Sequence, residues 1–355
     1  MQIPTVHIQP TAGSVLDDAI TKGSNENFWV EFGSNYTAVE PKVENGQLLS
    51  PTKVNQFFTV NGTKFSASAN DATALNGKVT CGDARPQGTI VGDTHGRVAL
   101  YDIFGEKTKD LEGHLLHTSV AKFFPSHEVA ISAGMDYSMK LYDLRAGGST
   151  AQSMRAQKGL VTSIAMIELG RNFISCCPSD AEKGLCLWEC SSNSVVRHFS
   201  VDGASQAAIF DQGASAVGKD HELEFGVSGK CAVVAANNLC MVDFRAEKLV
   251  DLHRGKSHAV SVSGDHLVTC SNDKTEIIDI RARKTLLEID QHCDNALAIS
   301  QTQFAFITGD QSIVYIYDTS TSQGYYCTVG HKTVQLAVST GGLYTFGDST
   351  RRFII

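Results

Sequence analysis

The stretch AISAGMDYSMKLYD, residues Ala130–Asp143, decides the fold. It consists of an apolar strand, a turn with an aspartate, a second alternating strand, and an aromatic residue followed by an acid. The stretch TIVGDTHGRVALYD, residues Thr89–Asp102, has the same order. Because these segments alternate with period two and are separated by Gly, Asn and Asp, they predict strands and tight turns. The helices of an α-solenoid are excluded by the same pattern.

Five more copies of this unit follow along the chain. They are SCCPSDAEKGLCLWE (Ser175–Glu189), VVAANNLCMVD (Val233–Asp243), VTCSNDKTEIID (Val268–Asp279), FITGDQSIVYIYD (Phe306–Asp318) and YTFGDSTRRFII (Tyr344–Ile355). The acids that close the first six copies are separated by 41, 46, 54, 36 and 39 residues. A period of about 40–45 residues built from short strands is typical of propeller blades. The sequence therefore predicts an all-β, seven-bladed β-propeller.

Dipeptides within the units resemble those of WD repeats. A Gly-His element stands ahead of two units, at Gly113-His114 and Gly330-His331. The position of the usual Trp-Asp pair is held by Trp188-Glu189, Tyr101-Asp102, Tyr142-Asp143 and Tyr317-Asp318. Since a single Trp remains at this position, the period indicates the fold more strongly than the dipeptide does.

The first 55 residues carry no copy of the repeat and are predicted to form an N-terminal extension or small domain. They contain a helix candidate at Ser14–Lys22 and a strand candidate at Asn27–Phe32. Residues 56–355 are predicted to form the propeller. The chain ends on a third strand, so we expect Gln56–Ser68 to supply the fourth strand of blade seven and cover its edge. Deletion of residues 1–70 should then lower the melting temperature sharply.

Composition narrows the class of function. The net charge is -8 and the pI is near 5.8, which disfavours nucleic acid and anionic membranes as partners. No apolar run of about 18 residues and no secretory signal is present. Ten cysteines without a small-scaffold spacing predict reduced thiols and a cytoplasmic and nuclear protein.

His114, Ser132 and Asp136 have the residue types of a hydrolase triad, but we interpret them as structural. In WD repeats a His, a Ser or Thr, the turn Asp and the Trp form a hydrogen-bonded chain within the blade, and Tyr142 would take the place of the Trp. Such a chain satisfies buried polar groups. No G-x-S-x-G turn is present. The sequence therefore predicts no catalytic residue, no cofactor and no enzyme activity, and Ser132→Ala should cost stability without abolishing any activity.

Two other groups of side chains could carry chemistry. Cys176, Cys177, Cys186 and Cys190 lack the paired spacing of a zinc site and are expected to be core thiols, with no metal. Arg145, Arg245 and Arg281 each follow an Asp as D-x-R. An arginine fork there could bind a partner carboxylate, as in WD substrate receptors that dock on the adaptor of a cullin–RING ubiquitin ligase. The Trp of those docking boxes is absent, and the alternative is that the arginines cap their loops.

Longer stretches of the chain resemble the proteasomal ATPase-associated factor family. They are KFFPS (Lys122–Ser126), ISAGMD (Ile131–Asp136), GRN (Gly170–Asn172), LWEC (Leu187–Cys190), ELEFG (Glu222–Gly226), Ile8-Gln9 and NFWV (Asn27–Val30). Two departures are a turn at Pro178–Gly184 that is two residues longer than in the second unit, and Cys176 at the expected place of a serine.

The resemblance implies a non-enzymatic scaffold that is monomeric on its own. Members of this family include an assembly chaperone of the proteasome regulatory particle that binds the C-terminal domain of an ATPase subunit. An acidic disc is expected to present one rim to a basic helical domain. Residues just before the turn aspartate line that rim in WD propellers, and the corresponding positions are Met135, Ser179, Asn272 and Gly309.

Overall fold

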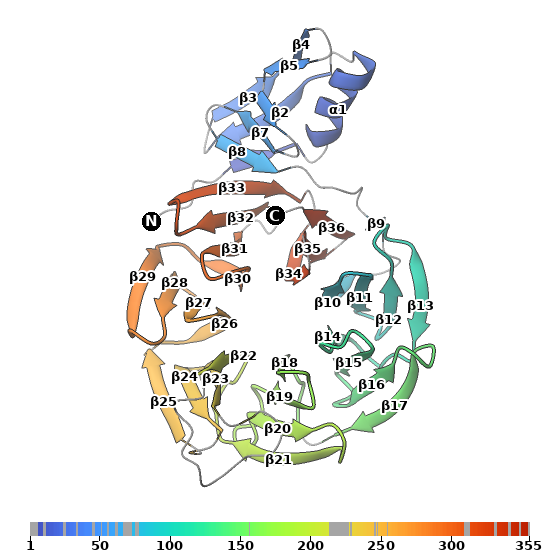
Figure 1. Cartoon of the computed structure of the whole chain (residues 1–355), viewed down its shortest axis with the longest axis vertical. Helices are drawn as coiled ribbons and strands as arrows, with labels where there is room; N and C mark the ends of the chain where they lie inside the picture. Colours follow the sequence, from blue (N-terminus) through green and yellow to red (C-terminus); the bar gives the residue numbers. More distant parts are fainter. Residues whose placement is uncertain are drawn as a thin grey trace.

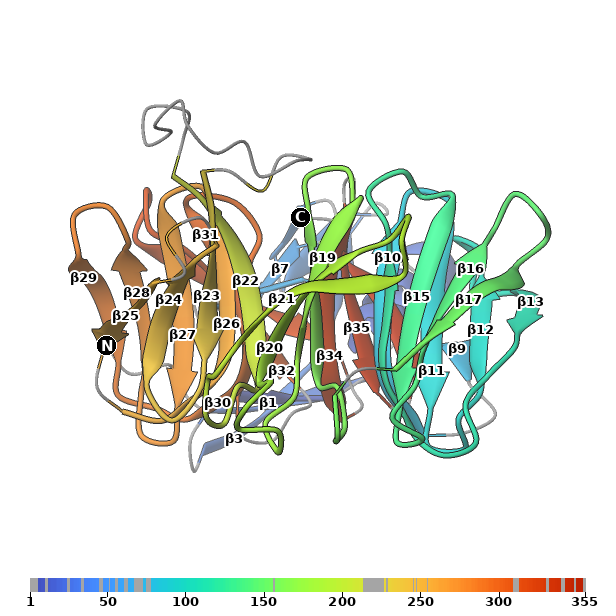
Figure 2. The same cartoon turned by 90° about the horizontal axis from the view of Figure 1, so that it is seen from below.

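Seven sheets surround a central axis in the computed structural model, and a small N-terminal domain lies outside the ring beside the sixth sheet (Figure 1). The predicted seven-bladed, nearly all-β propeller is confirmed. Seen from the side, the strands cross the thickness of a disc and the loops gather on its two faces (Figure 2). The structure describes residues 6–9, 12–23, 26–32, 35–44, 47–50, 52–54, 57–60, 63–66, 73–74, 78–155, 157–212, 227, 229–244, 246, 248–253, 255–308, 313–329, 332–339, 342–347 and 349–353.

Blades one to five each contain four strands in sequence order. Blade one has β10 (Val79–Arg85), β11 (Gly88–Asp93), β12 (Val98–Tyr101) and β13 (Lys107–Leu111). Blade two has β14 (Thr118–Phe123), β15 (Val129–Gly134), β16 (Met139–Asp143) and β17 (Ser149–Met154), and blade three has β18 (Ser163–Ile167), β19 (Asn172–Cys176), β20 (Leu185–Glu189) and β21 (Ser194–Phe199). Blade four has β22 (Gln206–Asp211), β23 (Lys230–Ala235), β24 (Leu239–Asp243) and β25 (Lys248–His253), and blade five has β26 (Ser257–Ser263), β27 (His266–Ser271), β28 (Thr275–Asp279) and β29 (Lys284–Ile289).

Burial follows position within the blade. Every residue of β11 is buried, whereas four of the five residues of β13 are exposed. The second strand is covered on both faces by neighbouring blades, so both sets of alternating side chains are buried. Most of the hydrophobic core therefore lies between blades.

Blade seven is closed by a different segment from the one predicted. It contains β34 (Thr333–Ser339), β35 (Gly342–Gly347), β36 (Ser349–Phe353) and the two-residue strand β9 (Thr73–Ala74). β9 pairs antiparallel with β36, while β8 (Thr63–Ser66) pairs parallel with β33 of blade six. β8 pairs with blade six because its wholly buried Phe65 packs on Tyr326 of β33, with ring centroids 5.8 Å apart. Chain ahead of blade one thus closes blade seven, but it is β9 and not residues 56–68.

Blade six contains β30 (Cys293–Ala298), β31 (Gln303–Thr308), β32 (Ile313–Asp318) and β33 (Gln323–Thr328). β8, β7 (Phe57–Val60) and β6 (Thr52–Val54) extend its sheet to seven strands. The remaining N-terminal elements are β1 (Val6–Ile8), α1 (Ala12–Lys22), β2 (Phe28–Phe32), β3 (Asn35–Val39), β4 (Lys42–Glu44) and β5 (Gln47–Ser50). One apolar cluster joins α1, β2 and β8 to blades five and six. The N-terminal unit therefore continues to β8, past the predicted boundary at residue 55.

A belt of hydrogen bonds joins the inner strands around the axis. Each bond runs from a side chain of one blade to a backbone carbonyl of the next, so it ties blades that share no sheet. The bonds are Thr80 Oγ1 to Thr118 O (2.5 Å), Ser119 Oγ to Val161 O (2.6 Å), Thr162 Oγ1 to Ser205 O (2.6 Å), Ser205 Oγ to His258 O (3.2 Å) and His258 Nε2 to Cys293 O (2.9 Å). The donor side chains of these bonds line a central cavity of about 460 Å³.

Candidate functional site

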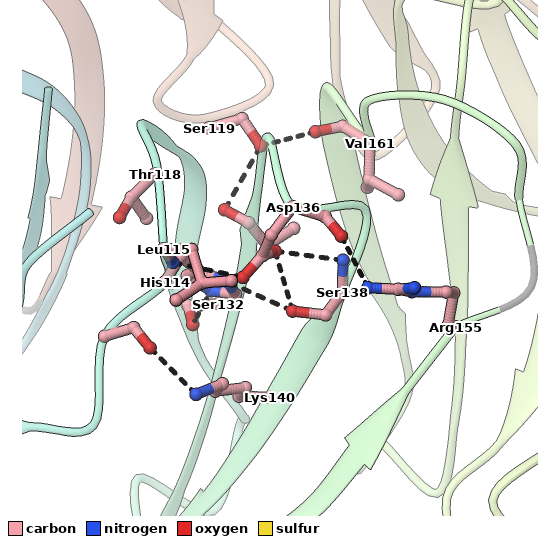
Figure 3. Close-up of polar contacts among 12 residues, drawn as sticks. His114, Leu115, Thr118, Ser119, Ser132, Asp136, Ser138, Lys140, Arg155 and Val161 are labelled. Carbon is pink, nitrogen blue, oxygen red and sulfur yellow. Dashed lines mark hydrogen bonds and ion pairs between the residues drawn. The ribbon is translucent and has the colours of Figure 1, made fainter. Parts of the chain in front are cut away.

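The four predicted tetrad residues come together in blade two. His114 lies in the loop that enters the blade, Ser132 on β15, Asp136 in the turn between β15 and β16, and Tyr142 on β16. His114 Nε2 is 2.7 Å from Ser132 Oγ, and His114 Nδ1 is 3.0 Å from Asp136 Oδ1 (Figure 3). Ser132 Oγ is 2.7 Å from the Tyr142 hydroxyl oxygen, which also lies 2.7 Å from the Glu112 carbonyl oxygen. These bonds tie the entering loop to both central strands and to the turn.

The electrostatics of this chain suit a structural role. Burial lowers the pKa of His114 although Asp136 acts in the opposite direction, so the imidazole is neutral at pH 7. Burial of Asp136 acts to raise its pKa, but hydrogen bonds from Ser138 and the Leu115 N–H outweigh it and hold the pKa at about 2. The Ser132 side chain is wholly buried between the imidazole and the Tyr142 ring. A nucleophile must reach its substrate, and this hydroxyl does not reach the surface.

Blade three contains a second chain of the same kind, which sequence reasoning missed. Trp188 Nε1 donates to Ser175 Oγ at 2.9 Å, and Ser175 Oγ donates to Gln157 Oε1 at 2.7 Å. Gln157 Nε2 in turn donates to the Lys183 carbonyl at 2.6 Å. Ser175, and not Cys176, is therefore the counterpart of Ser132. The signal was present in the spacing, because His114 precedes Ser132 by 18 residues and Gln157 precedes Ser175 by 18.

The cysteines of blade three are divided between two cores. Cys176 belongs to the apolar cluster between blades three and four, whereas Cys186 packs with Trp188 in the cluster between blades two and three. Burial raises the pKa of Cys176, and it raises the pKa of Cys186 and of Cys190 to about 12. Within the described part of the chain, no group of three or more His, Cys, Asp or Glu side chains is arranged to hold a metal ion.

Three of the four predicted rim residues are exposed in turns between second and third strands. Met135, Ser179 and Asn272 occupy such turns in blades two, three and five. Gly309 lies outside the described residues. The same face also exposes Leu115, Leu116 and Tyr137, which were not predicted because the position before the aspartate was the only one considered.

Two of the three predicted docking arginines, Arg145 and Arg281, lie in turns between third and fourth strands. Arg281 Nε is 2.6 Å from Asp265 Oδ1, and its terminal nitrogens donate to the carbonyls of Asp211 and Gln212 in blade four. Its guanidinium also lies over the Phe210 ring. Arg145 is more exposed and makes longer ion pairs with Glu128 and Asp143, at 3.5 and 3.8 Å. Arg245 lies outside the described residues.

Comparison with known proteins gives a partial match in sequence and matches in fold. No family model matches the sequence. A curated relative, the 26S proteasome regulatory subunit RPN14 of Saccharomyces cerevisiae, is 28% identical over an alignment of 155 residues that covers 41% of this chain and 36% of the yeast protein. The match thus spans about a third of that protein's length.

Solved structures with this fold include one titled "Structure of U3-55K" and one titled "Crystal structure of RRP9 WD40 repeats". Each has a TM-score of 0.65 and 12% identity, and they cover 80% and 81% of this chain and 98% of their own. The chain therefore shares the β-propeller fold of these structures. Among the residues that the structure describes, no helix is long and apolar enough to cross a membrane.

Proposed function

We propose that this protein is a non-enzymatic WD-repeat scaffold that assists assembly of the proteasome regulatory particle by binding the C-terminal domain of a proteasomal ATPase subunit. The observation that carries the proposal is the 28% identity to a yeast proteasome regulatory subunit over 155 residues. The stretches KFFPS at Lys122–Ser126 and LWEC at Leu187–Cys190, which resemble the proteasomal ATPase-associated factor family, point the same way.

The physical character of the molecule supports binding over catalysis. His114 and Ser132 are buried and are hydrogen-bonded within the blade. Hydrogen bonds around the axis tie successive blades together. A rigid disc presents its loops with little loss of conformational entropy on binding. None of the ten cysteines is in a disulfide, and nine are buried. Unbridged thiols are typical of a reducing compartment, and we propose that the protein works in the cytoplasm and nucleus.

Affinity purification tests the proposal directly. The tagged full-length chain is expressed in cells and its partners are identified by mass spectrometry. Each purified C-terminal domain of the proteasomal ATPases is then titrated against the chain by calorimetry. We expect one ATPase subunit to be enriched and its C-terminal domain alone to bind. Recovery of no proteasomal subunit, together with no binding in the titrations, would contradict the proposal.

The alternative role, a substrate receptor of a cullin–RING ligase, requires an arginine fork open to a partner. The fork of Arg281 is occupied by Asp265 and by backbone carbonyls of blade four. Of the two docking arginines that the structure describes, Arg145 is therefore the one that separates the two roles. Recovery of a ligase adaptor that is lost with Arg145→Ala would favour the receptor; an unchanged set of proteasomal partners with this variant favours the chaperone.

A further inference from the structure

Four large apolar side chains are exposed together on one face of blade two. Leu115 and Leu116 lie in the loop from blade one, and Met135 and Tyr137 lie in the turn between β15 and β16; their exposed fractions are 86%, 56%, 45% and 48%. We call these four residues the blade-two apolar patch. Of the other large apolar side chains that are exposed in the described residues, Phe104 and Leu169 belong to separate loops and the rest lie singly in strands of other blades. Grouped exposed apolar side chains of this kind mark interaction sites.

Hydrogen bonds hold the two halves of the patch in register. The Leu115 N–H donates to Asp136 Oδ2 at 3.2 Å, and the Met135 N–H donates to the His117 carbonyl at 2.9 Å. Figure 3 shows Leu115 beside the imidazole of His114, next to the turn that carries Asp136. The buried chain that stabilises the blade thus also fixes the backbone beneath the patch. A surface ordered before binding loses less conformational entropy when a partner arrives.

Tyr137 has a backbone conformation that its side chain disfavours. Its φ is 60°, in the left-handed region, and its N–H donates to the Gly134 carbonyl at 3.0 Å. The same turn position of blade one is Gly96, with φ 81° and an N–H that donates to the Asp93 carbonyl. Glycine adopts this conformation without strain, whereas a bulky residue does so at a cost. Since the Tyr137 ring is half exposed, burial within the fold does not offset that cost, and such strain points to a function of the side chain.

Positive charge borders the patch. The exposed Arg155 donates to the Asp136 carbonyl at 2.7 Å (Figure 3), and the exposed Lys158 lies three residues further in the loop that leads to blade three. Two carboxylates of the same face are engaged by the fold: that of Asp136 by His114 and backbone N–H groups, and that of Asp180 by the N–H groups of Lys158 and Lys183. Glu182, in the turn of blade three, is also exposed. Asp136 and Asp180 keep their charges but are engaged by the fold, so the exposed charged side chains named here are two cations, Arg155 and Lys158, and one carboxylate, Glu182.

We propose that the blade-two apolar patch binds an acidic, amphipathic segment of a protein partner. Its apolar side chains would lie on Leu115, Met135 and Tyr137, and its carboxylates would pair with Arg155 and Lys158. The expectation of a basic partner, drawn from net charge alone, is replaced for this surface by an acidic one. Such a partner need not be a proteasomal subunit.

Selection from a random dodecapeptide phage library tests the chemistry without a known partner. The full-length chain is immobilised, and enriched peptides are synthesised with a fluorophore and measured by polarisation. We expect enriched peptides to combine Leu, Phe or Trp with Asp or Glu, and their affinity to fall as salt rises. Enrichment of basic peptides, or of none, would overturn the proposal.

Variants locate the binding site. Tyr137→Gly should weaken binding about tenfold while the melting temperature stays the same or rises, because glycine relieves the backbone strain. Arg155→Gln should weaken binding and reduce its dependence on salt. Leu169→Ala, which removes an exposed side chain from the loop between β18 and β19, is the matched control and should bind as the wild type does.

Peptide binding that survives both Tyr137→Gly and Arg155→Gln would refute the binding site proposed at the blade-two apolar patch, even if proteasomal subunits are recovered with the chain. Conversely, loss of peptide binding in these variants supports the patch even if no proteasomal subunit is recovered. The two proposals therefore fail separately.

Discussion

Blades two and three carry a buried serine at the same position of their second strands and surround it with different side chains. In blade two Ser132 lies between His114 and Tyr142, and the imidazole continues the chain to Asp136. In blade three Ser175 lies between Trp188 and Gln157, and the chain ends on a backbone carbonyl. Both chains connect the entering loop to the two central strands. The hydroxyl is the shared element, because it can donate to one neighbour and accept from the other.

The turn aspartates show how the flanking residue changes the network. Asp136 accepts hydrogen bonds from the imidazole, from Ser138 and from the Leu115 N–H. Asp180, in the longer turn of blade three, accepts from the backbone N–H groups of Lys158 and Lys183 instead. Gln157 has no tautomers that a carboxylate would have to select between, unlike His114. The Asp180 carboxylate therefore binds only backbone N–H groups of the neighbouring loops. Blade two therefore concentrates more of its stability on one ionisable residue.

The largest expected effect is that of Asp136→Asn. It should lower the free energy of unfolding by about 3 kcal/mol, and more than Asp180→Asn does, because more buried donors lose an ionised acceptor. The pKa of Asp136 is held at about 2, below the ordinary value of about 3.9, so its contribution is present above about pH 4 and is lost as the pH falls toward 2. Urea titrations between pH 7 and pH 3 measure this. Equal losses of unfolding free energy in Asp136→Asn and Asp180→Asn would show that blade two does not depend on its turn aspartate more than blade three does.

Ser175→Ala should have the next largest effect, about 2 kcal/mol, because the change leaves the buried Trp188 N–H without its acceptor and frees Gln157 Oε1. Trp188 is stacked on Phe173, with ring centroids 5.8 Å apart, so the indole is not expected to turn toward another acceptor. Chemical denaturation gives the loss directly. Ser153→Ala, on the exposed outer strand of blade two, is the matched control and should change stability little.

Ser132→Ala is expected to cost less, about 1 kcal/mol, because the Glu112 carbonyl remains within reach as an acceptor for the Tyr142 hydroxyl. Binding of a partner should survive this change, since Ser132 lies beneath the surface. Calorimetry of the variant with the partner measures both quantities. A loss larger than that of Ser175→Ala would show that the tyrosine does not retain its second acceptor.

The sequence predicted the chain of blade two and missed that of blade three for identifiable reasons. A Gly-His pair and a turn Asp six residues before Tyr142 led to blade two. In blade three Gln157 takes the place of the histidine, and the longer turn shifts any count made from Asp180, which led to Cys176 in place of Ser175. Counting 18 residues back from the serine finds His114 in blade two and Gln157 in blade three, because the whole segment of loop and strand between them has the same length in the two blades.

Other features were beyond the sequence pattern. The period predicted seven blades because each blade repeats one buried strand pair. The closing strand β9 has only two residues, too few to show an alternating pattern. The FFTV segment of β7 does resemble a strand, and for that reason Gln56–Ser68 was predicted to close blade seven. The left-handed φ of Tyr137 depends on the geometry of its turn, and a tyrosine there gives no sign of it.

The smallest expected effect is that of His114→Gln, which gives blade two the flanking residue of blade three. Because burial lowers the pKa of His114, the folded state disfavours the imidazolium, so the stability that neutral His114 confers is present above its ordinary pKa of about 6.5 and is lost as the pH falls below that value. Glutamine does not titrate. The variant should lose about 0.5 kcal/mol at pH 7 and show a shallower fall in melting temperature between pH 7 and pH 5. His198→Gln, on exposed β21, is the control and should keep the wild-type slope; if His114→Gln keeps it too, the pH response does not originate in blade two.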